Sequence, residues 1–243
     1  MLKAAIEKIV SLATPVMTEV EGRTFCVGID GANEVRPQLD YAERITLNSL
    51  DSLIKMIKTE ALNLHPVPLY ITIPNHLTVD CFAQPNSDLR FLRQFLYQAK
   101  ATDVPGWEAS TTMKFEEAMI AIRTRFQDTP DSVYALKLLS DISTGAKITF
   151  NDNGIATQVV TQKGISLQTN EPIRPIVTLK PYRTYQEIEQ PASQFLIRVS
   201  DRGISFIEAD GGMWKLTARN TIKAYLEERL AKEVEDGAVV IAL

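Results

Sequence analysis

The spacing of apolar side chains divides this sequence into helical and extended segments. Apolar positions three or four residues apart are typical of an amphipathic helix, whereas alternation or a short apolar run is typical of a strand. Pro15 ends the first predicted helix, Asn48 or Ser49 can cap the second, and Thr129-Pro130 opens the fourth. Helical spacing predicts helices over residues 2–13, 50–57, 115–126, 130–139 and 218–230.

Extended patterns fill most of the remaining chain. A small hairpin is predicted around Gly22, and residues 28–44 read as an irregular connection. Residues 94–101 fit both a helix and a strand, and we favour the strand because it completes a three-stranded meander. Turns are expected at Pro74-Asn75, at the Asn-Asp-Asn-Gly segment 151–154, and at residues 201–203. The other predicted strands cover residues 69–73, 77–82, 147–150, 155–160, 164–167, 175–179, 195–199, 204–208 and 238–243.

The order of these elements predicts an α+β fold. Helices and strands mix in residues 1–143, whereas residues 144–243 form an antiparallel β-rich part closed by an amphipathic helix. A mild boundary falls at residues 143–146. The two parts can also belong to one continuous domain, because 243 residues fit one large domain or two small ones.

Composition and charge narrow the function classes. Hydrophobic residues make up 45% and charged residues 23%, which is typical of a globular chain. A net charge of −4 argues against broad binding of duplex nucleic acid. No apolar run is long enough to span a bilayer, and the first helix carries Glu7 and Lys8, unlike a signal peptide. Cys26 and Cys81 are too few for a disulfide framework, so we expect a cytoplasmic protein of a host cell.

Two carboxylates near the end of the chain are the leading candidates for chemistry. Glu208 and Asp210, followed by Lys215, are the residue types with which a nuclease holds Mg²⁺ and positions a phosphate. The alternative is structural: Asp210 caps the following helix, and Gly211-Gly212 gives the turn its backbone freedom. We favour the structural interpretation, because no further carboxylate is nominated by the sequence.

Other catalytic and metal-binding patterns are absent from the sequence. His65, His76, Cys26 and Cys81 lack the short spacings of a zinc site, and both histidines are expected to face solvent. Neither a Gly-x-Ser-x-Gly elbow nor a Walker or dinucleotide glycine pattern occurs. We therefore predict no metal, no cofactor and no catalytic residue, and favour a protein that is not an enzyme.

Aromatic side chains suggest contact surfaces. Arg90 to Arg93 with Tyr97 and Lys100 could bind single-stranded nucleic acid by stacking, but an ordinary strand with one buried aromatic face fits better with the acidic net charge. Four further aromatic residues can be core residues or anchors of a subunit interface. These are Trp107, Tyr182, Tyr185 and Trp214.

Several segments together resemble a group of phage and prophage proteins of unknown function. The resemblance rests chiefly on PYRTYQEIEQPASQF and EADGGMWKL, with support from MLKAAIEKIVSLA, RQFLYQAKA, KFEEAMIAIRTRF and ITFNDNGIATQVVTQKGIS. In layout the chain is also similar to the YfdQ-like prophage family, in which a helix precedes a hairpin and a late strand-helix unit. The resemblance covers most of the chain except residues 28–45. It implies a phage origin and large self-assembly, and it supplies no catalytic residue.

These observations lead to one expected function and two alternatives. The expectation is a non-enzymatic phage accessory protein that forms a homo-oligomer and binds a host or phage component. Residues 1–12 or the unguarded apolar strand 238–243 would make the subunit contact, although that strand can equally pair within its own sheet. One alternative is a DNA-metabolism protein, either a single-strand binder or a Mg²⁺-dependent nuclease using Glu208 and Asp210. The other is an anti-defence protein that sequesters a nucleotide signal.

Overall fold

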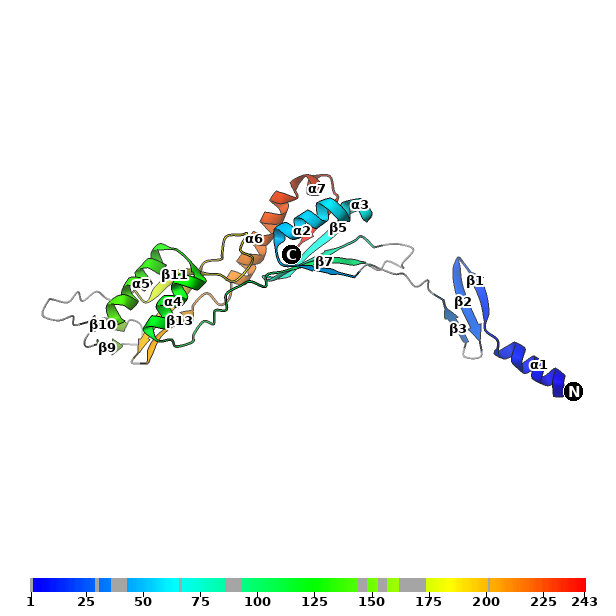
Figure 1. Cartoon of the computed structure of the whole chain (residues 1–243), viewed down its shortest axis with the longest axis horizontal. Coiled ribbons are helices and arrows are strands. Elements are labelled where there is room, and N and C mark those ends of the chain that lie inside the picture. The colour runs from blue at the N-terminus through cyan, green and yellow to red at the C-terminus, as the bar shows by residue number, and fades with distance from the viewer. Residues whose placement is uncertain are drawn as a thin grey trace. The chain divides into compact units, whose positions relative to one another are not determined.

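The chain divides into two compact units, each with its own sheet structure (Figure 1). A computed structural model describes residues 2–28, 31–35, 43–65, 67–85, 93–143, 148–152, 157–161, 174–200 and 202–243. Unit 1 covers Met1–Ala42 and unit 2 covers Glu43–Leu243. Helices and mainly antiparallel sheets coexist, so the predicted α+β class is confirmed.

Unit 1 combines a helix with a small antiparallel sheet. The sheet has the order β1-β2-β3, and Glu21 and Gly22, with φ of 50° and 73°, form the tight turn between its first two strands. The helix and the hairpin around Gly22 agree with the sequence prediction. Residues 31–34 were expected to be irregular, which is wrong, because hydrogen bonding to β2 orders a segment without apolar alternation. The elements are α1 (Leu2–Ala13), β1 (Val16–Val20), β2 (Arg23–Gly28) and β3 (Gly31–Glu34).

The first sheet of unit 2 has the order β14-β5-β6-β7-β4. Its strands are β4 (Ile45–Leu47), β5 (Leu69–Asn75), β6 (Thr78–Phe82), β7 (Phe95–Lys100) and β14 (Val239–Ala242). β5, β6 and β7 form the predicted meander, which confirms the strand assignment of residues 94–101. β4 and β14 pair parallel to their neighbours, so the terminal strand lies at one edge of its own sheet.

The turn between β5 and β6 lies at His76-Leu77, so the prediction of a turn at Pro74-Asn75 is wrong. Pro74 and Asn75 are still part of β5, where the register shifts between Thr72 and Asn75. The Asn75 side chain accepts a hydrogen bond of 2.8 Å from the Leu77 amide. A proline is tolerated at such an irregularity because the ladder there does not require its N–H.

Two helical segments pack beside each other and against this sheet (Figure 1). Ser49 caps the first of them by accepting a hydrogen bond from the Ser52 amide, one of the two caps that the sequence allows. The shared core contains Leu53, Ile71, Ile222 and Leu226. The helical elements are α2 (Leu50–Met56), the π-helical turn η1 (Ile57–Ala61), α3 (Leu62–Leu64), α6 (Trp214–Arg229) and α7 (Ala231–Glu235).

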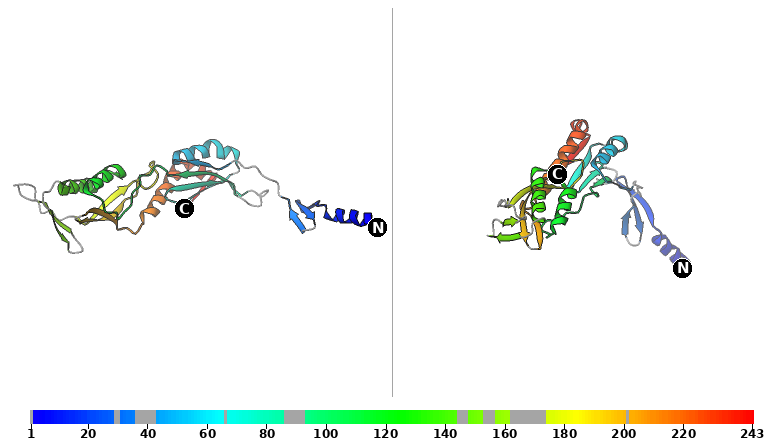
Figure 2. Two further views of the ribbon diagram at one scale, coloured as in Figure 1. Left: turned by 60° about the horizontal axis from the view of Figure 1, so that its bottom comes forward. Right: turned by 60° about the vertical axis from the view of Figure 1, so that its left-hand side comes forward.

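The second sheet of unit 2 has the order β13-β12-β11-β8 and packs against two adjacent helices (Figure 2). Its elements are α4 (Phe115–Arg125), β8 (Phe126–Gln127), α5 (Pro130–Ser143), β11 (Ile176–Pro181), β12 (Ser193–Ser200) and β13 (Gly203–Glu208). The outer edge of β13 is covered by residues 110–113. Hydrogen bonds join Ser110 to Phe206 and join Met113 to Ile204 in both directions.

The predicted hairpin after α5 is present as β9 (Ile148–Asp152) paired antiparallel with β10 (Thr157–Thr161). Residues 153–156 of its turn and the predicted strand 164–167 lie outside the described residues. The described residues of unit 2 form two buried clusters. The first draws on residues 50–99 and 185–239, and the second draws on residues 118–206. A domain boundary near residue 143 stays a prediction.

In the part of the chain that the structure describes, no helix is both long and apolar enough to cross a membrane.

Candidate functional site

Arg183 is the centre of a polar cluster between the two sheets of unit 2. It follows β11, and only 8% of the residue is exposed. Its guanidinium donates hydrogen bonds of 2.5 Å to Glu208 Oε1 and to Ser193 Oγ. The guanidinium also lies 4.0 Å from the centre of the Trp214 ring. Burial lowers the pKa of Arg183, while Glu208 opposes that shift. Arginine nevertheless stays charged in proteins, so this is a buried cation that needs its carboxylate partner.

Asp210 extends the same network. Its Oδ2 accepts the Ser193 hydroxyl hydrogen at 2.6 Å, and its Oδ1 accepts the Gly212 amide hydrogen at 3.0 Å. Gly211 and Gly212 have φ of 63° and 80°, a backbone conformation that glycine adopts without steric cost. The N-cap position of α6 is Met213, which makes no side-chain cap bond, so Asp210 holds the turn instead of capping the helix. We call Arg183, Ser193, Glu208, Asp210 and Trp214 the junction cluster.

The hydrogen bonds of the junction cluster argue against the hypothesis that Glu208 and Asp210 hold a Mg²⁺ ion. Glu208 is engaged by a guanidinium, and both oxygens of Asp210 accept internal hydrogen bonds. A Mg²⁺ ion would have to displace these donors and leave the Arg183 charge buried without compensation. Among the residues that the structure describes, no three His, Cys, Asp or Glu side chains are grouped as metal ligands. The arrangement favours a structural role for both carboxylates.

His76 contacts the junction cluster from the turn between β5 and β6. Its ring packs edge-on against Trp214 with 4.7 Å between ring centres, and its carbonyl accepts the Thr184 hydroxyl hydrogen at 2.5 Å. His76 is therefore half-buried instead of fully facing solvent as expected, because the turn lies against the first residue of α6. Burial, followed by the charges of Lys215 and Arg183, lowers the pKa of His76 below its ordinary value of 6.5.

The four aromatic interface candidates have different environments. Tyr185 is 1% exposed and donates to the Ala99 carbonyl at 2.7 Å, and burial raises its pKa. Trp214 is also buried, so these two residues join the sheets instead of presenting a surface. Tyr182 and Trp107 are half-buried.

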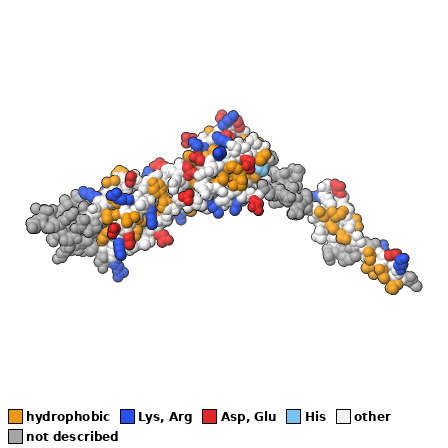
Figure 3. Space-filling model, viewed as in Figure 1, with side chains coloured by type: hydrophobic (Ala, Val, Ile, Leu, Met, Phe, Trp, Pro, Cys, Tyr) orange, Lys and Arg blue, Asp and Glu red, His pale blue; other side chains and the backbone are white. Residues whose placement is uncertain are grey.

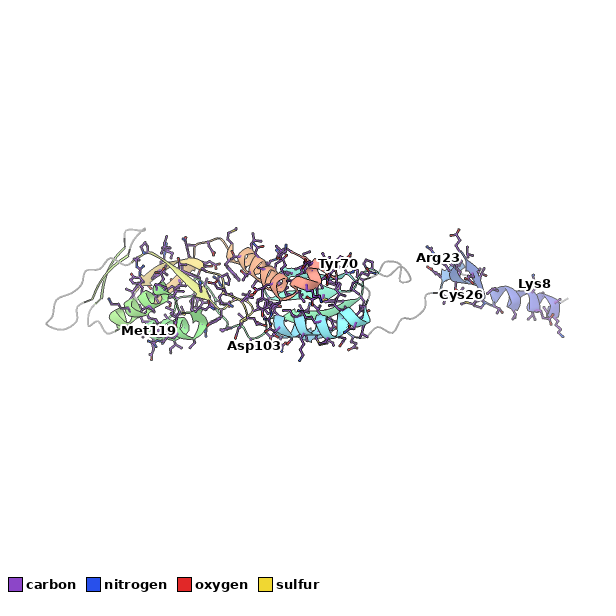
Figure 4. The ribbon with its side chains drawn as sticks, turned by 90° about the horizontal axis from the view of Figure 1, so that it is seen from above. Lys8, Arg23, Cys26, Tyr70, Asp103 and Met119 are labelled. Carbon is purple, nitrogen blue, oxygen red and sulfur yellow. The ribbon has the colours of Figure 1, made fainter. Side chains whose placement is uncertain are left out.

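Trp107 lines an open groove of about 560 Å³ between residues 106–113 and α4. Its ring packs edge-on against Phe126, with 4.7 Å between ring centres. Met113 and the exposed Ile120 contribute apolar surface to the groove. Met119, the neighbour of Ile120 on α4, is labelled in Figure 4.

A second hollow of about 390 Å³ lies between the start of α2 and residues 101–104 and 184–187, close to Asp103 (Figure 4). Two of its carboxylates, Glu187 and Asp51, have hydrogen-bond partners. Glu187 accepts the Leu50 amide hydrogen at 2.7 Å, and Asp51 accepts the Tyr225 hydroxyl hydrogen at 2.7 Å. Both acidic groups stabilise the helix pair of the first sheet.

The strand proposed as a single-strand binder is built as a core strand. Tyr97 is 2% exposed and its hydroxyl donates to Glu60 at 2.8 Å, so its ring is not available for stacking on a base. Arg93 lies over the ring of Tyr70 at 4.1 Å, and Tyr70 is labelled in Figure 4. Arg90 lies outside the described residues. The geometry agrees with the ordinary interpretation of this segment.

Unit 1 exposes many of its apolar side chains. Of the side chains described in residues 2–35, none is buried. Leu2 is 77% and Ile9 is 64% exposed on α1, and Val16 is 57% exposed on β1. Figure 3 shows hydrophobic side chains on the visible face of unit 1. In the antiparallel pairing of β1 with β2, Thr18 lies opposite Phe25 and Val16 lies opposite Val27, so one face of the sheet is mainly apolar.

The sequence did not indicate that Arg183 and Ser193 belong to the junction cluster, or that His76 contacts it. Arg183 carries a weak local signal, because it stands between two tyrosines in Pro-Tyr-Arg-Thr-Tyr. Comparison with protein-family models, with curated proteins and with solved structures found no match for this chain.

Proposed function

We propose that this protein is a non-enzymatic accessory protein of a phage or prophage that acts as a homo-oligomer assembled through unit 1. The observation that carries the proposal is the lack of buried side chains among those described in unit 1. A folded segment of this size stabilises itself only by removing apolar surface from water, and a 12-residue helix is marginal in isolation. Contact with another molecule would provide the missing burial.

Self-association is favoured over catalysis because the candidate catalytic groups are already engaged. Glu208 and Asp210 hold Arg183 and the turn before α6. The resemblance of the sequence to phage and prophage proteins supports the assignment to a phage system. Its similarity in layout to the YfdQ-like prophage family supports self-assembly.

Binding of a host or phage component is the second part of the proposal. It draws on the resemblance and on the groove beside Trp107, where exposed apolar surface lies next to Glu108, Glu117 and Arg125. An apolar surface edged by charges is typical of protein contact sites.

Size-exclusion chromatography with light scattering tests the assembly. We expect the full chain to elute as an oligomer, and the double substitution Ile6→Lys and Ile9→Lys to reduce its mass toward the 27.2 kDa of one chain. Two lysines in the apolar face of α1 would carry charge into the contact, which is costly.

Leu64→Lys is the matched control, because Leu64 is 70% exposed on α3 of unit 2. It should leave the mass distribution unchanged. A wild-type chain that runs as a monomer at micromolar concentration would overturn the proposal.

A further inference from the structure

β1 forms an open edge of the unit 1 sheet. The sheet order β1-β2-β3 leaves one side of β1 without a partner strand among the described residues. All five residues of β1 are exposed, and its sequence Val-Met-Thr-Glu-Val contains no lysine or proline. Charged side chains, proline and bulges are the usual means of preventing an edge from pairing with another chain, and β1 contains a single charged residue, Glu19, so this edge is weakly protected.

The turn geometry determines which backbone groups point outward. Val20 and Arg23 flank the two-residue turn, and the positive φ of both Glu21 and Gly22 identifies it as type I′. The residues that flank such a turn form a hydrogen-bonded pair, and along the strands such pairs alternate with non-hydrogen-bonded ones. The N–H and C=O groups of Val16, Thr18 and Val20 therefore face β2, and those of Met17 and Glu19 face outward.

The other side of β2 agrees with this alternation. The Thr24 carbonyl accepts the Val35 amide hydrogen at 2.8 Å, so it points away from β1. Thr24 lies opposite Glu19 in the register, as a non-hydrogen-bonded pair should.

We infer that two copies of this chain pair their β1 strands antiparallel about a two-fold axis at Thr18. The two three-stranded sheets then form one six-stranded sheet. This inference rests on the proposed function and names its interface. In this register Met17 of each copy pairs with Glu19 of the other, so all four outward N–H and C=O groups of each strand are used.

Neighbouring registers satisfy the edge less well. An axis at Met17 would place Glu19 opposite Pro15, which has no N–H to donate. An axis at Glu19 would place two like charges directly opposite each other. The Thr18 register avoids both problems.

The same register joins the apolar faces of the two sheets. Val16 of one copy lies opposite Val20 of the other, on the face that also contains Phe25 and Val27. Val16, Val20 and Val27 are 57%, 51% and 40% exposed in the single chain. A doubled apolar face offers a surface on which the two α1 helices can bury their apolar stripes.

A disulfide crosslink tests the axis in the full-length protein. Thr18 would face Thr18 of the second copy in a non-hydrogen-bonded pair, with Cα atoms about 4.5 Å apart, which suits a disulfide. Thr18→Cys in a Cys26→Ser background should form a dimer on oxidation at least tenfold faster than Glu19→Cys in the same background. The two Glu19 Cα atoms would be about 8 Å apart, too far for a bridge.

A second pair of variants tests the hydrogen bonds. Met17→Pro removes an outward N–H and leaves the bonds to β2 in place, so we expect loss of the oligomer. Met17→Ala shortens the side chain but keeps the N–H, and should retain the oligomer.

Each result has a defined meaning. Equal crosslinking of the two cysteine variants in an oligomeric protein, or an unchanged oligomer in Met17→Pro, would refute the β1 interface and leave assembly through unit 1 standing. A monomeric wild-type protein would refute both.

Discussion

Residues 2–35 and residues 43–243 use the same kinds of element but bury their apolar side chains very differently. In unit 2, α6 places Ala218, Ile222 and Leu226 against a sheet, and each is 0% exposed. In unit 1, α1 has the same helical spacing, yet Leu2, Ile6 and Ile9 are all more than half exposed. Amphipathic spacing thus indicates which side chains need burial, and not whether the same chain provides it.

The largest difference between the units should appear when a phenylalanine is shortened in each. Phe206 is 0% exposed in the second cluster of unit 2, so Phe206→Ala should lower the free energy of unfolding of unit 2 by about 4 kcal/mol. Phe25→Ala in unit 1 should leave the free energy of unfolding of unit 2 unchanged. Tryptophan fluorescence in urea measures unit 2 selectively, because both tryptophans of the chain, Trp107 and Trp214, lie in unit 2. A similar shift of the urea midpoint in both variants would contradict the expectation that unit 2 unfolds independently of unit 1.

Replacing a glycine should likewise cost more stability in unit 2 than in unit 1. Gly203 has φ of 133°, and a Cβ there would lie 2.0 Å from the Met113 carbonyl oxygen, so Gly203→Ala should cost about 3 kcal/mol. Gly22 has φ of 73° with no other atom within 4 Å of a Cβ, so Gly22→Ala should cost about 1 kcal/mol and only in unit 1. Urea unfolding followed by tryptophan fluorescence should detect the first variant alone. Wild-type stability in Gly203→Ala would show that residues 110–113 do not hold the edge of β13.

The smallest expected effect is a pH dependence confined to unit 2. The folded state lowers the pKa of His76, so below about pH 6.5 the unfolded chain binds a proton that the folded chain binds less well. This contribution to stability is therefore complete above pH 6.5 and is lost as the pH falls through the folded-state pKa. His76→Phe keeps a ring against Trp214 but cannot titrate, and its melting temperature should fall less than that of the wild type between pH 7.5 and 5. Parallel pH profiles of the two proteins would contradict this role of His76.

Local patterns predicted most elements because those elements bury one face. α4, α5, α6, β12 and β13 all follow from apolar spacing and turn residues. β3 was missed because Gly-Ala-Asn-Glu has no apolar alternation and owes its order to β2. The parallel pairing of Val239 with Leu69 joins residues far apart in the sequence, and no local pattern encodes it.

The candidate site was predictable only in part. The carboxylates Glu208 and Asp210 and the double-glycine turn are visible in the sequence as residue types. Their partner Arg183 precedes Glu208 by 25 residues, and its burial depends on how β11, β13 and α6 meet. A charged residue between two tyrosines gives no local indication of which carboxylate will neutralise it.

The exposed apolar surface of unit 1 has a consequence for the way its folding responds to dilution. If a second copy supplies the burial, the free energy that keeps unit 1 folded contains a concentration term, and each tenfold dilution weakens it by about 1.4 kcal/mol per mole of dimer. Unit 2 carries its own core and has no such term. At low concentration a protease should therefore remove unit 1 first and leave unit 2 intact, whereas at high concentration both should resist digestion.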